Sequence, residues 1–120
     1  MKKKILVECV SSDARFAISN KNTLRIYSAN EDYVYNENFN KATIFLTDIV
    51  IKIPKNYIGL VFTSQELLDK NISIKNNIKI LESNTTTMLN IPLTSKDTQY
   101  INKHTHIATL YLIKQKNIRI

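Results

Sequence analysis

The sequence predicts an all-β fold with one short helix. Apolar and β-branched residues occur in short runs, and polar clusters of Asn, Ser, Asp and Lys separate these runs at regular intervals. Short strands spaced in this way are typical of a sandwich or barrel. With 120 residues and 43% apolar composition, the chain has the size of one domain with its own core. We therefore expect a single domain over residues 1–120.

The expected strands follow the apolar runs in chain order, at residues 5–10, 16–18, 24–27, 43–53, 58–62, 78–81, 88–93 and 107–113. The clearest alternation is in the fourth run, where Ile49, Ile51 and Ile53 fall on one face. Asp48 and Lys52 fall on the other face. This pattern predicts a strand with one side in the core.

One helix is expected near residues 64–70. The Thr63 hydroxyl is placed to cap its first turn, and Glu66, three residues later, can return a bond to the cap amide. Just before it, Gly59 is the only glycine in the chain. Glycine is favoured where φ is positive or where the backbone passes close to another segment, so we expect geometry to require it.

The amino-terminal segment reads as a first strand. The apolar residues that follow Lys2, Lys3 and Lys4 are interrupted at Glu8, too early for a secretory signal. No apolar stretch approaches the roughly 18 residues that cross a bilayer. Cys9, the single cysteine, is expected to be a small buried residue without a disulfide. We expect a soluble, non-secreted protein with no membrane partner.

The net charge of +7 favours nonspecific attraction to nucleic acid or to other anionic partners. The lysines are scattered and form no helical stripe, so they do not indicate a specific nucleic-acid site. Ile, Asn and Lys dominate the composition, as an AT-rich genome would produce. This bias indicates a virus, a phage or a low-GC microbe.

Two segments are candidate protein-binding surfaces. In the polar stretch 30–40, Tyr33, Tyr35 and Phe39 form either an exposed contact surface or a strand whose aromatic rings point inward. At the carboxyl end, Ile118 and Ile120 either finish an edge strand or add a strand to a peptide-binding groove of PDZ type.

The segment 51–61, with its Ile-Pro-x-x-Tyr-x-Gly order around Gly59, resembles a segment of the trimeric dUTPase family. Residues 24–29 are similar to the first motif of that family, and 104–110 are similar to the fourth. The resemblance implies a dUTPase-like β-clip or jelly-roll-like barrel and a possible homotrimer.

The positions that carry chemistry in the family differ in this chain. Arg25 stands where the family has the aspartate of its first motif, which helps to hold magnesium. Ser64 and Gln65, with Glu66, stand where it has an Arg-Ser-Gly trio that grips phosphates. Leu81 takes the position of the water-activating aspartate and Asn84 that of the tyrosine that stacks on deoxyribose. Leucine cannot accept a proton, which leaves Glu82 as the local candidate base.

These substitutions predict a protein that is not an enzyme and needs no metal or cofactor. His104 and His106 are interpreted as paired surface histidines, because a zinc site needs further ligands. The predicted function is a non-catalytic interaction or structural protein on an inactive dUTPase-like scaffold, a minor capsid or cementing component. The chain is similar in this respect to the dUTPase-like early-region proteins and the accessory proteins of adenoviruses.

Three alternatives remain open: an adaptor that binds host proteins, a residual nucleotide-binding enzyme, and a basic protein that binds nucleic acid. The expected location is the virion, or the nucleus or cytoplasm of a host cell.

Overall fold

The computed structural model describes residues 6–20, 22–36, 38 and 41–115. Three residues of the predicted interaction surfaces, Phe39, Ile118 and Ile120, lie outside this part of the chain. The described elements are β1 (Leu6–Cys9), β2 (Phe16–Asn20), β3 (Thr23–Tyr27), β4 (Asp32–Val34), β5 (Thr43–Ile53), β6 (Tyr57–Thr63), α1 (Gln65–Leu68), β7 (Ile72–Ile74), β8 (Ile78–Leu81), β9 (Thr85–Ser95), β10 (Gln99–Ile101) and β11 (His106–Lys114).

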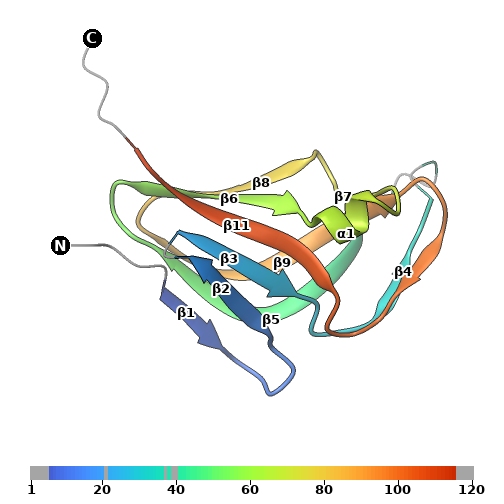
Figure 1. Ribbon diagram of the computed structural model, residues 1–120, viewed down its shortest axis with the longest axis horizontal. Helices are drawn as coiled ribbons and strands as arrows, with labels where there is room; N and C mark the ends of the chain where they lie inside the picture. Colours follow the sequence, from blue (N-terminus) through green and yellow to red (C-terminus); the bar gives the residue numbers. More distant parts are fainter. Residues whose placement is uncertain (1–5, 21, 37, 39–40, 116–120) are drawn as a thin grey trace, which may run out of the picture.

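The strands form three antiparallel sheets. A four-stranded sheet has the order β1-β5-β9-β7, and a five-stranded sheet has the order β2-β3-β11-β6-β8. A two-stranded ribbon of β4 and β10 lies at one end of the molecule, away from β1 and β2 (Figure 1). The all-β prediction with one short helix is confirmed. No described helix is long and apolar enough to cross a membrane.

The core lies between the two larger sheets. Ile49, Ile51 and Ile53 of β5 are fully buried, as their alternation predicts, while Lys52 is exposed. From the facing sheet, the alternating residues of β3, β6 and β11 point inward. The core residues from that sheet include Leu24, Ile26, Val61, Leu110 and Leu112.

Two strands, β7 and β10, were missed because each has only three residues, too few to show a period of two in the sequence. β4, which is equally short, lies in the stretch 30–40, where a strand was one of the two interpretations. The helix was placed correctly but its cap was not. Ser64, with extended backbone, is the N-cap and accepts a hydrogen bond from the Leu67 amide. Thr63 belongs to β6, and its hydroxyl accepts from the Ile74 amide at 2.8 Å.

Gly59 is required by close approach and not by its φ angle. A Cβ atom at this position would lie 3.0 Å from Ile53 Cδ1 and 3.1 Å from Leu110 Cδ1. Positive φ angles among the described residues belong to other residue types, which are Asp48, Asn56, Asn71, Asn76, Asn77, Asn84 and His104. Asparagine tolerates the left-handed region better than most residues. The abundant asparagines therefore supply turns that glycine supplies in other proteins.

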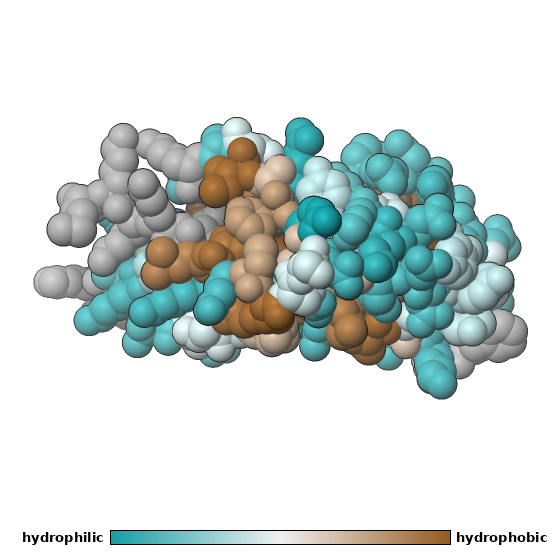
Figure 2. Space-filling model, turned by 90° about the horizontal axis from the view of Figure 1, so that it is seen from below, coloured by the Kyte–Doolittle hydropathy of each residue, from teal (hydrophilic) through white to brown (hydrophobic). Residues whose placement is uncertain are grey.

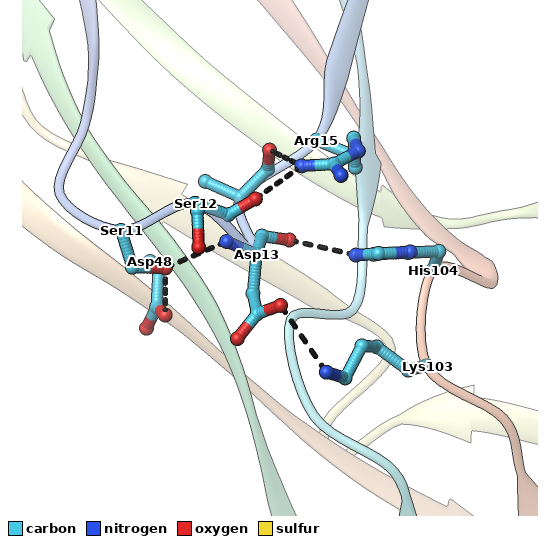
Figure 3. Close-up of polar contacts among 8 residues, drawn as sticks. Ser11, Ser12, Asp13, Arg15, Asp48, Lys103 and His104 are labelled. Carbon is cyan, nitrogen blue, oxygen red and sulfur yellow. Dashed lines mark hydrogen bonds and ion pairs between the residues drawn. The ribbon is translucent and has the colours of Figure 1, made fainter.

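The loop between β1 and β2 is held by polar contacts to two other segments (Figure 3). Ser11 Oγ donates to Asp48 Oδ2 at 2.6 Å, where β5 has a bulge in its pairing with β9. Lys103 Nζ contacts Asp13 Oδ1 at 3.1 Å, and the His104 ring lies 3.0 Å from the Asp13 carbonyl oxygen. These contacts join the loop to the segment that precedes β11.

The sandwich is open along β1 and β2, which are the edge strands of their sheets. Cys9 pairs with buried Ile49, and Ile18 pairs with buried Leu24, so both side chains point toward the core side. Both are nevertheless exposed, Ile18 at 65%. Figure 2 views the molecule from the side where β1 and β2 lie in Figure 1 and shows an apolar band there. The predicted burial of Cys9 is therefore wrong, because no strand covers this edge within the described residues.

Candidate functional site

A shallow, open groove of about 1010 Å³ lies on the outer face of the five-stranded sheet. It is lined by residues of β3, β6 and β11, by the hairpin between β2 and β3, and by the start of α1. Arg25 of β3 lies opposite Thr109 of β11, which lies opposite Phe62 of β6. Because opposed residues of antiparallel strands share a face, these three side chains form one row across the sheet.

Arg25 points out of the core. Its neighbours Leu24 and Ile26 are fully buried, and side chains alternate along a strand, so the guanidinium lies on the groove side. The cation therefore occupies the floor of the groove, where it favours an anion over a metal ion.

The start of α1 adds polar groups to the same groove. Gln65 and Glu66 are exposed and line it, and the Gln65 side-chain amide donates to Asp69 Oδ1 at 2.8 Å. Ser64 is buried, and its hydroxyl donates to the His106 carbonyl oxygen at 2.6 Å while it caps the helix. Its hydroxyl is thus occupied by a structural role.

His106 joins these two parts of the site. Its ring lies 5.3 Å from the Tyr27 ring, and its Nε2 is 3.1 Å from Thr109 Oγ1. Burial lowers the pKa of His106 below its ordinary value of 6.5, and Arg25 acts in the same direction, whereas Glu66 raises it. His104 does not share this face, since it sits in the preceding turn with a φ of 66°. The predicted histidine pair is therefore not formed.

Leu81 and Asn84 lie away from the groove. Leu81 is buried in β8 opposite Gly59, and Asn84 is exposed in the turn before β9 with a φ of 59°. Of the predicted positions, the structure thus brings Arg25 and Gln65 together, with Glu66 beside them. It does not bring Leu81 or Asn84 to the same place within one chain.

The groove does not fit the magnesium ion that the family resemblance implies. Magnesium is bound in proteins chiefly by carboxylate and phosphate oxygens. Glu66 is the one carboxylate among the lining residues, and the cation Arg25 lines the same groove. The described part of the chain holds no group of three or more His, Cys, Asp or Glu residues able to bind a metal.

A second exposed surface lies on the ribbon of β4 and β10. The predicted residues Tyr33 and Tyr35 are 49% and 43% exposed, while Val34 between them is fully buried. The segment therefore contains a strand, β4, which ends just before Tyr35, but both tyrosines point outward, contrary to the interpretation with inward rings. Tyr100 of β10 completes this surface and was missed, because it lies far away in the sequence and only strand pairing brings it opposite Tyr33.

The fold has known counterparts among phage dUTPases. No protein-family model and no curated protein matches the chain. A mutant dUTPase from phage phi11 of S. aureus, described with a structural Mg(II) ion, matches with a TM-score of 0.81 and 16% identity over 98% of this chain and 95% of that chain. A mutant dUTPase of Staphylococcus bacteriophage 80alpha with dUpNHpp matches with a TM-score of 0.82 and 16% identity over 99% and 95%.

A further mutant of the phage 80alpha dUTPase, described in connection with its SaPI inducing capacity, matches with a TM-score of 0.82 and 16% identity over 100% of this chain and 89% of that chain. These matches show that the chain has a dUTPase-like fold, as the sequence predicted. They also correct one conclusion. The sequence-based statement that the chain is not an enzyme is contradicted, because its structural counterparts are dUTPases, which are enzymes.

Proposed function

We propose that this chain acts by binding other proteins through its dUTPase-like scaffold, as a minor capsid or cementing component of a virus particle. The observation that carries the proposal is the apolar outer face of the five-stranded sheet. Phe62, Ile80, Tyr111 and Ile113 project from this face and are between 40% and 58% exposed. Large contiguous apolar patches on a folded protein mark interaction sites.

Other copies of the chain are the first proposed occupants of this face, in a homotrimer. Phe62 and Tyr111 contact each other edge to face, with ring centroids 5.6 Å apart, and Leu60 lies opposite both Tyr111 and Ile80. Aromatic residues of this kind are enriched at protein interfaces. The resemblance to the trimeric dUTPase family supports the same assembly.

The structural role is tested by the composition of purified particles of the virus or phage that encodes the chain. A cementing component is expected at a fixed ratio to the major capsid protein after repeated density-gradient purification. An adaptor, the alternative within the same class, is expected in the infected cell and not in the particle. Loss of the chain from particles during purification would therefore contradict the structural role and favour the adaptor.

A second candidate function, nucleotide binding, is favoured by the groove itself. It collects Arg25 and Thr109 on the sheet face and Gln65 at the start of α1, and a counterpart of the fold was solved with dUpNHpp. A calorimetric titration of the chain with dUpNHpp, with and without Mg²⁺, tests it. Saturable micromolar binding that is lost in an Arg25→Ala variant would support this candidate, and heats equal to those of dilution would contradict it.

A further inference from the structure

The ribbon of β4 and β10 has one face in the core and one face in solvent. Val34 and Ile101 are 0% and 4% exposed and hold the ribbon against the rest of the molecule. Tyr33 and Tyr100 are opposed in register, so their side chains share the solvent face. Val34 and Ile101 point into the core. Because side chains alternate along a strand, the neighbouring residues Tyr33 and Tyr100 must point to solvent.

The three tyrosines of the ribbon form a continuous aromatic surface. The rings of Tyr33 and Tyr100 meet edge to face with centroids 5.0 Å apart, and Tyr35 lies 6.3 Å from Tyr33 at an interplanar angle of 31°. Each residue is 43% to 49% exposed. The rings pack on one another, so their outer faces stay available to a partner while their own mobility is restricted.

Two carboxylates lie beside this surface, although the net charge of the protein is +7. Glu31 and Asp32 directly precede Tyr33 in the chain, whereas the segment before Tyr100 contains both Lys96 and Asp97. The Tyr100 hydroxyl donates to Glu31 Oε2, and the Tyr33 amide donates to Asp32 Oδ1 at 2.7 Å. The bond to Glu31 is the main cause that raises the pKa of Tyr100 to about 12. Carboxylates therefore lie directly beside the rings.

We propose that the tyrosine surface, made of Tyr33, Tyr35 and Tyr100 with Glu31, binds an arginine-containing basic segment of a partner protein. This inference rests on the proposed protein-binding function and names the chemistry of one partner. A guanidinium stacks on aromatic rings and forms paired hydrogen bonds with a carboxylate, which an ammonium group cannot do. The Tyr100 hydroxyl donates to Oε2 of Glu31, which holds this carboxylate beside the aromatic surface. A nucleic acid would also stack on tyrosines, but its phosphates are repelled by these carboxylates.

The test is an NMR titration of the full chain with three capped peptides that alternate glycine with arginine, lysine or glutamate, and with single-stranded oligothymidine. We expect the arginine peptide to shift the resonances of Tyr33, Tyr35 and Tyr100 saturably and to bind more tightly than the lysine peptide. Stronger binding of the glutamate peptide or of oligothymidine at the ribbon would overturn the proposal. Chemical-shift changes that are confined to residues of other surfaces would also overturn the proposal.

Two variants locate the interaction. Tyr33→Ala is expected to weaken binding of the arginine peptide about two- to fivefold, the value of an exposed cation–π contact, whereas Tyr33→Phe keeps the ring and the affinity. Glu31→Gln is expected to weaken binding up to about fivefold at low salt. Glu8→Gln makes the same charge change at an exposed site on β1 and is expected to change nothing. Equal affinities across Glu31→Gln, Tyr33→Ala and the wild type would overturn the proposal.

The result of the peptide titration can be distinguished from the result of the test of the proposed function. Each variant is first checked for a dispersed spectrum, and Tyr33 and Glu31 lie outside the apolar sheet face. Peptide binding at the ribbon by a chain that is missing from particles would leave this inference intact and remove the cementing role. A chain that is present in particles but does not bind the peptide would remove this inference and leave the cementing role intact.

Discussion

Replacing Gly59 with alanine tests how the two large sheets are packed. Gly59 lies in β6 directly opposite Leu81 of β8 and Leu112 of β11, and its φ angle is not positive. If only the backbone mattered, alanine would stabilise the protein by about 0.4–1 kcal/mol, because it restricts the unfolded chain. The structure opposes this gain, because an added Cβ atom meets three side chains.

The size of the effect follows from the contacts. The new Cβ atom would lie 3.0 Å from Ile53 Cδ1, 3.1 Å from Leu110 Cδ1 and 3.3 Å from Leu81 Cβ. The optimal carbon–carbon distance is about 3.5–4.0 Å. The two Cδ1 atoms can move, but the Leu81 Cβ atom is attached to a paired strand and cannot. Overpacking of this kind costs about 1–3 kcal/mol, so we expect a net destabilisation of about 0.5–2 kcal/mol.

The assay is urea unfolding followed by far-ultraviolet circular dichroism. Ile53→Val removes the Cδ1 atom nearest to the new methyl group and costs about 0.5–1.5 kcal/mol by itself. In that background the cost of Gly59→Ala should fall, which gives a coupling of about 0.5–1 kcal/mol in a double-mutant cycle. A higher unfolding midpoint for Gly59→Ala, or strict additivity with Ile53→Val, would refute the packing argument.

Three further outcomes are expected. Ser64→Ala should lower the free energy of unfolding by about 1–2 kcal/mol, because it removes the cap of α1 and the bond to the His106 carbonyl; an unchanged urea midpoint would contradict this. Asn77→Ala should cost about 1 kcal/mol while Asn77→Gly should not destabilise, since this residue has a φ of 73°; thermal unfolding of both variants decides the point. Stability should fall as the pH drops below 6.5 and level off below the lowered pKa of folded His106, because the unfolded chain binds the proton first. His106→Gln should reduce this dependence in urea titrations at several pH values, and an equally steep dependence in that variant would exclude His106 as the cause.

The long elements could be predicted because their pattern is local. The eleven-residue strand β5 shows the alternation of Ile49, Ile51 and Ile53 directly in the sequence, and all three are buried. The three-residue strands β4, β7 and β10 carry no such period, since their pairing partners decide their conformation. Cys9 was misjudged for the same reason. Its apolar neighbours indicate burial, but only the arrangement of the sheets shows that the edge is open.

The candidate site was predictable in part. The motif order placed Arg25 and Gln65 in related positions, and the structure brings both to one groove. The tyrosine surface was half predicted, from Tyr33 and Tyr35 in a polar segment. Tyr100 could not be added, because its approach to Tyr33 depends on strand pairing between distant segments.

The proposed association of copies through the outer face of the five-stranded sheet is tested by the molar mass of the chain in solution, measured by light scattering over a range of concentrations. We expect about three times the chain mass of 13.9 kDa, with Tyr111→Glu shifting the mass toward one chain. Met88→Glu alters a residue of similar exposure on β9, in the other sheet, and should leave the assembly unchanged. A wild-type mass of one chain at all concentrations, or equal masses for wild type and Tyr111→Glu, would contradict assembly through this face.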